Sequence, residues 1–319
     1  MKNNWLIMAA AGLLLLCGCG ESGADKLKIG VSVPAATHGW TGGVVWCAEQ
    51  AKKEIEAANP DVEVIVTLGE TTSAQADRIE NLLARRVDAL VVLCQEPGPL
   101  TPVCEQAKKS GTYVVIVSNP LSNRVEDLFV NGDNRSLGAA AAEAMGQLLG
   151  GKGEILVMEG IPCPINTDRV EAFREVLAEK YPEIAILESQ PAWWNTEKGM
   201  SLMENYLQKY PKIDGVWAGD DDVLIGALKA YEESGRSDIK AMVGGGGSKA
   251  IIKKVLDNDP VVRATVTYSP EMISVGIEKA LEGLRNGGKP VNGEKELLIP
   301  SEIIMNSNAA EYYNAESVY

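Results

Sequence analysis

Residues 89–94 read Ala-Leu-Val-Val-Leu-Cys, and none of them carries a charged, amide or hydroxyl side chain. A strand that is apolar on both faces belongs inside a parallel sheet that helices cover on both sides. The flanking residues agree, since one helix is predicted at 73–85 behind Thr71-Thr72-Ser73 and another begins at Thr101-Pro102 and ends at Gly111. A buried strand between two helices indicates an α/β fold.

The alternation of strands and helices extends in both directions from this strand. Strands are predicted at 26–33, 62–68 and 113–117, with a helix at 42–59. After Asn131-Gly-Asp-Asn134 the same pattern restarts, with strands at 154–158, 184–189, 215–218 and 240–243 and helices at 167–180, 196–210, 222–234 and 248–257. Two such runs predict two doubly wound lobes. A ligand site is expected between them, at the loops after residues 33, 94, 117, 158, 218, 243 and 267.

The first residues have the layout of an export signal. Lys2 precedes the apolar run 5–16, which is shorter than the about 20 residues that a membrane span needs. The run ends in Cys17-Gly-Cys19, which resembles a lipobox, and Cys19 is the predicted lipidation site because Gly18 supplies the small residue before it. We therefore expect a lipoprotein signal peptide at 1–18 and a tether at 19–25. An ordinary secretion signal is the alternative.

Composition excludes several classes of function. The net charge of −14 argues against nucleic acid, because binding to phosphates depends on clustered Lys and Arg. Cys47, Cys94, Cys104 and Cys163 lack the paired spacing of a zinc site and are expected to be free thiols, with a Cys94–Cys104 disulfide left open. The chain contains a single histidine, His38, so catalysis that relies on His is scarcely available. We expect no catalytic residue, no metal and no cofactor.

Short motifs along the chain carry a family resemblance. They include Ile29-Gly-Val-Ser-Val-Pro34, Val130-Asn-Gly-Asp-Asn134, Arg169-Val-Glu-Ala-Phe173, Val216-Trp-Ala-Gly-Asp-Asp221 and Arg263-Ala-Thr-Val266. Their order and spacing resemble those of the ribose- and galactose-type periplasmic sugar-binding proteins of ATP-binding-cassette (ABC) importers. The resemblance covers nearly the whole chain after the export signal.

The resemblance implies the periplasmic binding protein type I fold. Such a protein has two Rossmann-like lobes that are joined by three crossings and close around the ligand by hinge motion. The N-terminal lobe would hold residues 26–131 and 268–296, and the C-terminal lobe would hold residues 132–267 and 297–319. The crossings would lie near Gly132, Thr267 and Pro300.

The resemblance also implies ligand-binding residues. Carried over by position, they are His38, Trp40, Asn119, Arg169, Trp194, Asp220 and Tyr268. These side chains suit a sugar, because aromatic rings stack on its C–H face while its hydroxyls need charged or amide partners. The Arg169 guanidinium can donate a planar pair of hydrogen bonds, and the Asp220 carboxylate can accept two hydroxyls.

Two positions depart from the family pattern. Pro120 stands where ribose binders carry an arginine, and Gly244-Gly-Gly-Gly247 stands where they carry an aspartate. Trp193 is expected to replace the missing side chains with surface, and Gln95 and Glu96 with acceptors after the third strand; of these, Trp193 and Gln95 are assigned to the site. The departures argue against ribose and leave another monosaccharide, a sugar alcohol or a larger glycoside open. The glycine tract itself is expected to form a close-approach turn beside the ligand, because it lacks the lysine and hydroxyl of a phosphate-binding loop.

The expected function is that of a lipid-anchored, extracytoplasmic sugar or polyol receptor that delivers its ligand to an ABC importer permease. We expect a monomer that meets the membrane only through its lipid. A sugar sensor that signals to a chemoreceptor or sensor kinase is the alternative. An enzyme on this fold is disfavoured, because residues 30–43 lack a dinucleotide-binding glycine pattern. The run Asp220-Asp-Asp222 lacks the alternating ligands of a calcium loop.

Overall fold

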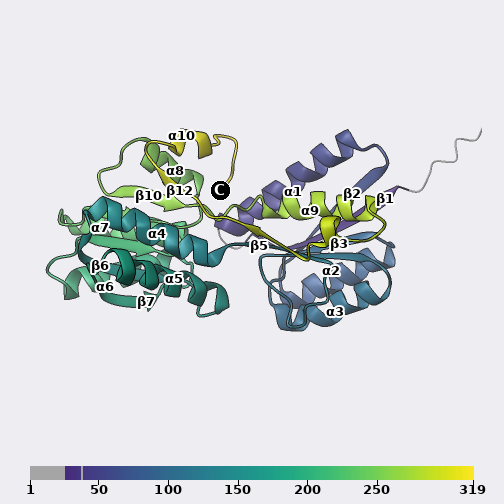
Figure 1. Cartoon of the computed structure of the whole chain (residues 1–319), viewed down its shortest axis with the longest axis horizontal. Helices are drawn as coiled ribbons and strands as arrows, with labels where there is room; N and C mark the ends of the chain where they lie inside the picture. The colour runs from purple at the N-terminus through teal and green to yellow at the C-terminus, as the bar shows by residue number, and fades with distance from the viewer. Residues whose placement is uncertain (1–25, 37–38) are drawn as a thin grey trace, which may run out of the picture.

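The computed structural model describes residues 26–36 and 39–319, which form two α/β lobes lying side by side (Figure 1). Each lobe is built on a six-stranded sheet. The predicted signal peptide, tether and Cys19, and the candidate ligand residue His38, lie outside the described residues. The prediction of two doubly wound α/β lobes is confirmed.

The N-lobe is the lobe built on the sheet β11-β5-β4-β3-β1-β2, in which every pairing is parallel. Its strands are β1 (Leu27–Pro34), β2 (Val62–Gly69), β3 (Ala89–Val92), β4 (Tyr113–Val117), β5 (Leu128–Gly132) and β11 (Glu296–Ile299). Its helices are α1 (Gly39–Ala58), α2 (Thr72–Ala84), α3 (Pro97–Lys109) and α9 (Met272–Arg285). Helices α1 and α9 pack on one face of the sheet, and α2 and α3 pack on the other. All residues of β3 and β4 are buried, as their apolar sequences predict.

The C-lobe is built on the sheet β12-β10-β9-β8-β6-β7, in which β12 alone runs antiparallel to its neighbour. Its strands are β6 (Lys152–Glu159), β7 (Glu183–Pro191), β8 (Gly215–Ala218), β9 (Ala241–Val243), β10 (Val262–Val266) and β12 (Ile303–Met305). Its helices are α4 (Asn134–Leu149), α5 (Pro164–Lys180), α6 (Thr196–Lys209), α7 (Asp221–Ser234), α8 (Lys249–Leu256) and α10 (Ala309–Tyr312). The Trp217 ring stacks on Phe173 with centroids 4.0 Å apart, so Trp217 belongs to the core.

Within the described ranges the chain passes between the two lobes at three places: between β5 and α4, between β10 and α9, and between β11 and β12. Two of these crossings are hydrogen bonded to each other, since Thr267 N donates to Glu302 O at 2.9 Å and Glu302 N donates to Thr267 Oγ1 at 2.8 Å. The crossing segments therefore hold one another at the junction of the lobes.

Three predicted helix starts are wrong. Helix α1 begins at Gly39 and not at Gly42, and α5 begins at Pro164 and not at Thr167. Helix α3 begins at Pro97 and not at Thr101-Pro102, which lie inside it. Three prolines stand close together here, and each could occupy the first turn of a helix, where a missing N–H costs nothing. The Thr101 hydroxyl donates to Pro97 O at 2.7 Å and accepts from Ser122 N at 3.0 Å, so it joins the helix to a loop instead of capping it.

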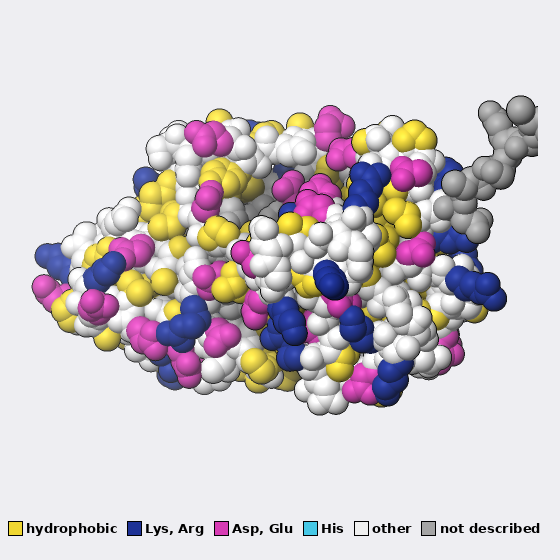
Figure 2. All heavy atoms as spheres, turned by 45° about the vertical axis from the view of Figure 1, so that its right-hand side comes forward, with side chains coloured by type: hydrophobic (Ala, Val, Ile, Leu, Met, Phe, Trp, Pro, Cys, Tyr) yellow, Lys and Arg dark blue, Asp and Glu magenta, His cyan; other side chains and the backbone are white. Residues whose placement is uncertain are grey.

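The cysteines in the part of the chain that the structure describes are free thiols, as predicted, and Cys47, Cys94 and Cys104 are buried. Burial raises the pKa of the Cys47 thiol to about 12, so it stays protonated. Among the described residues no group of acidic, Cys or His side chains could hold a metal ion, and no helix is long and apolar enough to cross a membrane. Acidic and basic side chains are interspersed over the face shown in Figure 2.

Candidate ligand-binding site

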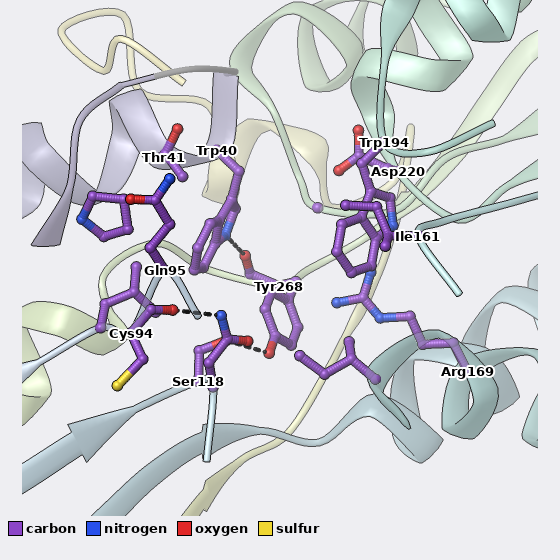
Figure 3. Close-up of a pocket in the computed structure, with 15 residues that line it drawn as sticks. Trp40, Thr41, Cys94, Gln95, Ser118, Ile161, Arg169, Trp194, Asp220 and Tyr268 are labelled. Atoms are coloured by element: carbon purple, nitrogen blue, oxygen red, sulfur yellow. Dashed lines mark hydrogen bonds between the residues drawn. The ribbon is translucent and has the colours of Figure 1, made fainter. Parts of the chain in front are cut away.

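A cavity of about 300 Å³ lies between the lobes, at the carboxyl ends of the strands. It is lined by Pro34, Trp40, Thr41, Leu93, Cys94, Gln95, Ser118, Asn119, Ile161, Ile165, Arg169, Trp194, Asp220, Gly246 and Tyr268. The lining residues follow β1, β3 and β4 of the N-lobe and β6 to β10 of the C-lobe. Figure 3 shows the side chains of the two lobes on opposite sides of this cavity, with Tyr268 between them.

Arg169 is the buried cation of the C-lobe wall. It lies on α5 and is only 5% exposed. Its Nε donates to Asn134 Oδ1 at 2.9 Å and its Nη1 donates to Gly219 O at 3.1 Å. The guanidinium carbon lies 4.4 Å from the centroid of the Tyr268 ring. The two bonds fix the guanidinium plane, and no hydrogen bond within the described residues uses Nη2, which is therefore available to an acceptor on a ligand.

Asp220 lies beside Arg169 at the start of α7. Its Oδ1 caps the helix by accepting from Asp222 N at 2.8 Å, and the residue is 9% exposed. Burial, and next the negative charge of Asp222, raise the pKa of the Asp220 carboxyl to about 7, although Arg169 favours the ionised form. The carboxyl therefore exchanges its proton near neutral pH. When ionised, it can only accept hydrogen bonds.

Trp193 and Trp194 lie in the loop between β7 and α6, and the backbone separates their side chains. Both have positive φ values, 61° and 52°. The indole of Trp194 lines the cavity and packs against Gly160, where a Cβ would lie 2.0 Å from Nε1, so glycine is required there. Trp193 is 46% exposed, does not line the cavity, and has Lys198 Nζ 4.4 Å above its ring. The structure thus brings Trp194 to the site and leaves Trp193 outside it.

The N-lobe wall is made of neutral side chains. Trp40, on the first turn of α1, donates from Nε1 to Tyr268 O at 2.8 Å. Asn119 follows β4 and donates from Nδ2 to Cys94 O at 2.8 Å. Gln95 follows β3, and its Oε1 is buried without a hydrogen-bond partner among the described residues. Trp40 Nε1 and Asn119 Nδ2 are thus already used by backbone carbonyls.

Tyr268 contacts both lobes from the crossing between β10 and α9. Its hydroxyl forms a 3.0 Å hydrogen bond with Ser118 Oγ of the N-lobe, and its backbone N donates to Gly246 O of the C-lobe at 3.1 Å. A Cβ on Gly132 would lie 2.1 Å from the Tyr268 ring, so the first crossing needs a glycine at this point. The position of Tyr268 relative to Arg169 and Trp40 therefore depends on how the lobes are placed.

Seven of the nine residues that the sequence assigned to the site line one cavity: Trp40, Gln95, Asn119, Arg169, Trp194, Asp220 and Tyr268. Their contact with a ligand stays a prediction. The sequence analysis missed Thr41, Ser118, Ile161 and Ile165, which also line the cavity. Their positions in the sequence could have indicated this. Ser118 and Ile161 follow the carboxyl ends of strands, and Thr41 and Ile165 lie at the amino ends of helices, and these ends point at the cavity.

The sequence profile of the periplasmic binding protein domain matches residues 29–287, most of the chain. The chain belongs to this family. A xylitol-binding protein from Mycolicibacterium smegmatis is 31% identical over 245 residues, covering 73% of this chain and 67% of that protein. The ribose import binding protein of Bacillus subtilis is 28% identical over 301 residues, covering 91% of this chain and 95% of that protein.

Solved structures agree on the fold. A periplasmic solute-binding protein of an ABC transporter from Actinobacillus succinogenes, solved with bound D-allose, superimposes with a TM-score of 0.80. It is 24% identical and covers 90% of this chain and 100% of that one. The family consists of extracytoplasmic sugar- or polyol-binding proteins of ABC importers, which are not enzymes. The predicted ribose- and galactose-type family and the absence of an enzymatic function are thereby confirmed.

Proposed function

We propose that this periplasmic binding protein is a lipid-anchored receptor that binds a monosaccharide or a sugar alcohol between its lobes and delivers it to an ABC importer permease. The observation that carries the proposal is the buried pair Arg169 and Asp220 beside the indole of Trp194, in a cavity of about 300 Å³. A cavity of this size accommodates one small ligand.

The chemistry of the cavity suits a ligand rich in hydroxyl groups. Trp194 Nε1 is a buried donor without an acceptor, and Gln95 Oε1 is a buried acceptor without a donor, among the described residues. An unpaired buried polar group costs about 1 to 3 kcal/mol, and a hydroxyl can both donate and accept. Hydroxyls of a ligand would pair with Arg169 Nη2 and the Asp220 carboxylate directly, and would pair with the two buried atoms once the Trp194 and Gln95 side chains turn toward the ligand.

The relatives support the ligand class and not a single compound. Their names specify xylitol and ribose, and the similar solved structure holds D-allose. The departures at Pro120 and at the glycine tract 244–247 disfavour a ribose site with the usual polar contacts. The proposal therefore covers pentoses, hexoses and the polyols derived from them.

Binding would couple to hinge closure. Arg169 and Asp220 belong to one lobe and Trp40, Gln95 and Asn119 to the other, so a ligand touches all of them only when the lobes are together. A ligand shifts a conformational equilibrium only by the contacts that differ between the two states. The permease would then recognise the closed, loaded form. The proposal keeps His38 as a ligand residue and Cys19 as the lipidation site, and it gives Trp193 no ligand role.

A thermal-shift screen of the chain from residue 24 tests the ligand class, because a ligand that binds only the folded state raises the melting temperature. The panel contains pentoses, hexoses, their sugar alcohols and inositols, with amino acids as the negative set. We expect a shift with one or a few sugars or polyols, verified by isothermal titration calorimetry. A shift with amino acids alone, or no shift with any carbohydrate, would contradict the proposal.

The lipid anchor is tested by fractionation of cells that express the full-length protein or its Cys19→Ala variant. Only the protein with Cys19 should sediment with membranes.

A further inference from the structure

Tyr319 lies between the two lobes, outside the ligand cavity. The end of the chain, marked C in Figure 1, lies between the lobes beside α1, and Tyr319 is only 7% exposed. A Cβ on Gly43 of α1 would lie 2.7 Å from Tyr319 Cβ, and a Cβ on Gly246 of the C-lobe would lie 2.1 Å from Tyr319 Oη. The tyrosine therefore packs against the backbone of both lobes at positions where only glycine leaves room.

The segment before Tyr319 is attached to the C-lobe. Lys249, at the start of α8, donates from Nζ to Ser317 O and lies 3.5 Å from Ala315 O. Tyr319 N donates to Ser317 Oγ at 3.2 Å, which orients the last residue against this segment. The tyrosine is thus carried by the C-lobe, and its contact with α1 is a contact between the lobes.

A direct hydrogen bond between the lobes lies at the same place. Gly39 N, at the start of α1, donates to Asp222 Oδ2 of α7 at 3.0 Å. A Cβ on Gly39 would lie 2.9 Å from Asp222 Oδ1 and 3.2 Å from Tyr319 Cδ2. A side chain at Gly39 would hold α1 away from both groups. The glycines of α1 therefore permit the two lobes to approach each other here.

The ring of Tyr319, and not its hydroxyl, makes this contact favourable. The hydroxyl is buried and has no hydrogen-bond partner among the described residues. Burial and the nearby charges of Asp220, Asp221 and Asp222 raise the pKa of the phenol well above its ordinary value, so it stays neutral. An unpaired buried hydroxyl opposes the contact, whereas a buried aromatic ring stabilises it.

We propose that Tyr319 is a positioning residue for ligand binding, whose ring fills the space between α1 and Gly246 only when the lobes are closed and thereby slows ligand release. The inference rests on the proposed function, which is closure of the lobes around a ligand. It adds a residue that influences closure without touching the ligand. Opening the lobes must separate the ring from Gly43, because Lys249 holds it on the C-lobe. Contacts made in one state alone shift the equilibrium toward that state.

The experiment compares Tyr319→Ala and Tyr319→Phe in the full chain with the matched control Val318→Ala, whose side chain is 58% exposed. The first measurement is small-angle X-ray scattering without ligand. We expect a larger radius of gyration for Tyr319→Ala than for the wild type, and an unchanged radius for Tyr319→Phe and Val318→Ala. Circular dichroism and the melting temperature confirm that each variant is folded.

The second measurement is the dissociation rate of xylitol or, if xylitol does not bind, of the sugar or polyol with the largest thermal shift in the screen, by stopped-flow fluorescence. We expect release about tenfold faster from Tyr319→Ala, and no faster than from the wild type for Tyr319→Phe, since this variant keeps the ring and loses only the unpaired hydroxyl. Gly43→Ala, which disturbs the same contact from the N-lobe, should also speed release, and less so when Tyr319 is already alanine.

Two outcomes would overturn the inference. One is a Tyr319→Ala protein that matches the wild type in scattering and release. The other is a Tyr319→Phe protein that is as defective as Tyr319→Ala, which would assign the effect to the hydroxyl. Scattering without ligand still decides the point if no sugar binds, so a failure of the proposed function is distinguishable from a failure of this inference.

Discussion

The two walls of the cavity are built differently. On the C-lobe wall, Arg169 and Asp220 are buried and are fixed by hydrogen bonds within their own lobe. Arg169 carries a positive charge, and Asp220 carries a negative charge when it is ionised. On the N-lobe wall, Trp40 and Asn119 are neutral, and their donors are occupied by backbone carbonyls. Figure 3 shows Trp40 on one side of Tyr268 and Arg169 and Asp220 on the other. Under the proposed function, the C-lobe wall would be arranged for ligand hydroxyls before binding, and the N-lobe wall would add surface on closure.

This difference has an energetic consequence. Groups held in place before binding lose little conformational freedom when the ligand arrives, so their contacts contribute more to affinity. Hydrogen bonds to charged groups are also about twice as strong as those between neutral groups. Variants of the C-lobe wall should therefore weaken binding more than variants of the N-lobe wall. The four predictions below test that order.

The largest effect is expected for Arg169→Ala. Arg169 is a buried cation whose Nη2 would donate to the ligand, and a hydrogen bond to a charged group contributes about 1.5 to 3 kcal/mol, so affinity should fall about 30-fold. The loss also leaves Asn134 Oδ1 and Gly219 O without their donor, which should lower the melting temperature. Isothermal titration calorimetry measures the affinity. The control is Arg174→Ala, an exposed arginine on the same helix, and equal effects of the two variants would contradict the comparison.

Asp220 should give the binding affinity a pH dependence. Its carboxyl has a pKa of about 7 and is a charged acceptor with both oxygens available only when ionised, so affinity should rise with pH through that value. At pH 6 binding should be about tenfold weaker than at pH 8, as follows from the ionised fraction. The affinity of Asp220→Asn should be low and nearly independent of pH.

The neighbouring carboxyl of Asp221 could also produce a pH dependence, so its effect must be separated from that of Asp220. Burial raises the pKa of its carboxyl also to about 7, but it accepts from Ser248 N and Thr265 Oγ1 inside the C-lobe. Titrations of the wild type and Asp220→Asn between pH 5.5 and 8.5 separate the two groups. If the pH dependence persists in Asp220→Asn, the assignment to Asp220 is wrong.

Trp194→Ala should weaken binding about tenfold, because it removes a stacking surface and the unpaired Nε1 donor, and an aromatic contact of this kind contributes about 0.5 to 1.5 kcal/mol beyond its buried area. Trp193→Ala is the matched control, since the neighbouring indole lies outside the cavity. Fluorescence titration is suitable for both. A loss of affinity in Trp193→Ala that equals the loss in Trp194→Ala would contradict the positions that the structure gives them.

The smallest effect is expected for Gln95→Ala on the N-lobe wall. A neutral hydrogen bond contributes about 0.5 to 1.5 kcal/mol, and deleting Gln95 also removes the unpaired Oε1, so affinity should fall about threefold. Calorimetry with the same ligand gives the value. A fall as large as that of Arg169→Ala would show that the two walls contribute equally.

The fold and the location of the site could be predicted from particular stretches of the sequence. The apolar run 89–94 predicted a strand buried in a parallel sheet, and β3 is wholly buried. The loops after the predicted strands line the cavity, because the carboxyl ends of parallel strands meet at one edge of each sheet. The start of α3 was misplaced, because one proline among three cannot be identified as the first helical residue from sequence alone.

The distinction between the two tryptophans could not be read from the sequence. Trp193 and Trp194 are the same residue type at consecutive positions, and their directions depend on two positive φ values and on the space above Gly160. The glycine tract 244–247 had an expected role beside the ligand, but its packing against Tyr319 joins residues more than 70 positions apart. Such contacts depend on how the whole chain folds.

The sequence by itself determined the α/β class and the two lobes, because periodicity is a local property of the chain, and its motifs indicated the family and, by resemblance, the candidate side chains Arg169, Asp220 and Trp194. Only the tertiary structure decided which of these side chains face one cavity, which hydrogen bonds remain open there, and that Tyr319 lies between α1 and Gly246. The physical reason is that burial and unpaired hydrogen-bonding groups arise from the packing of distant segments, which no local pattern specifies.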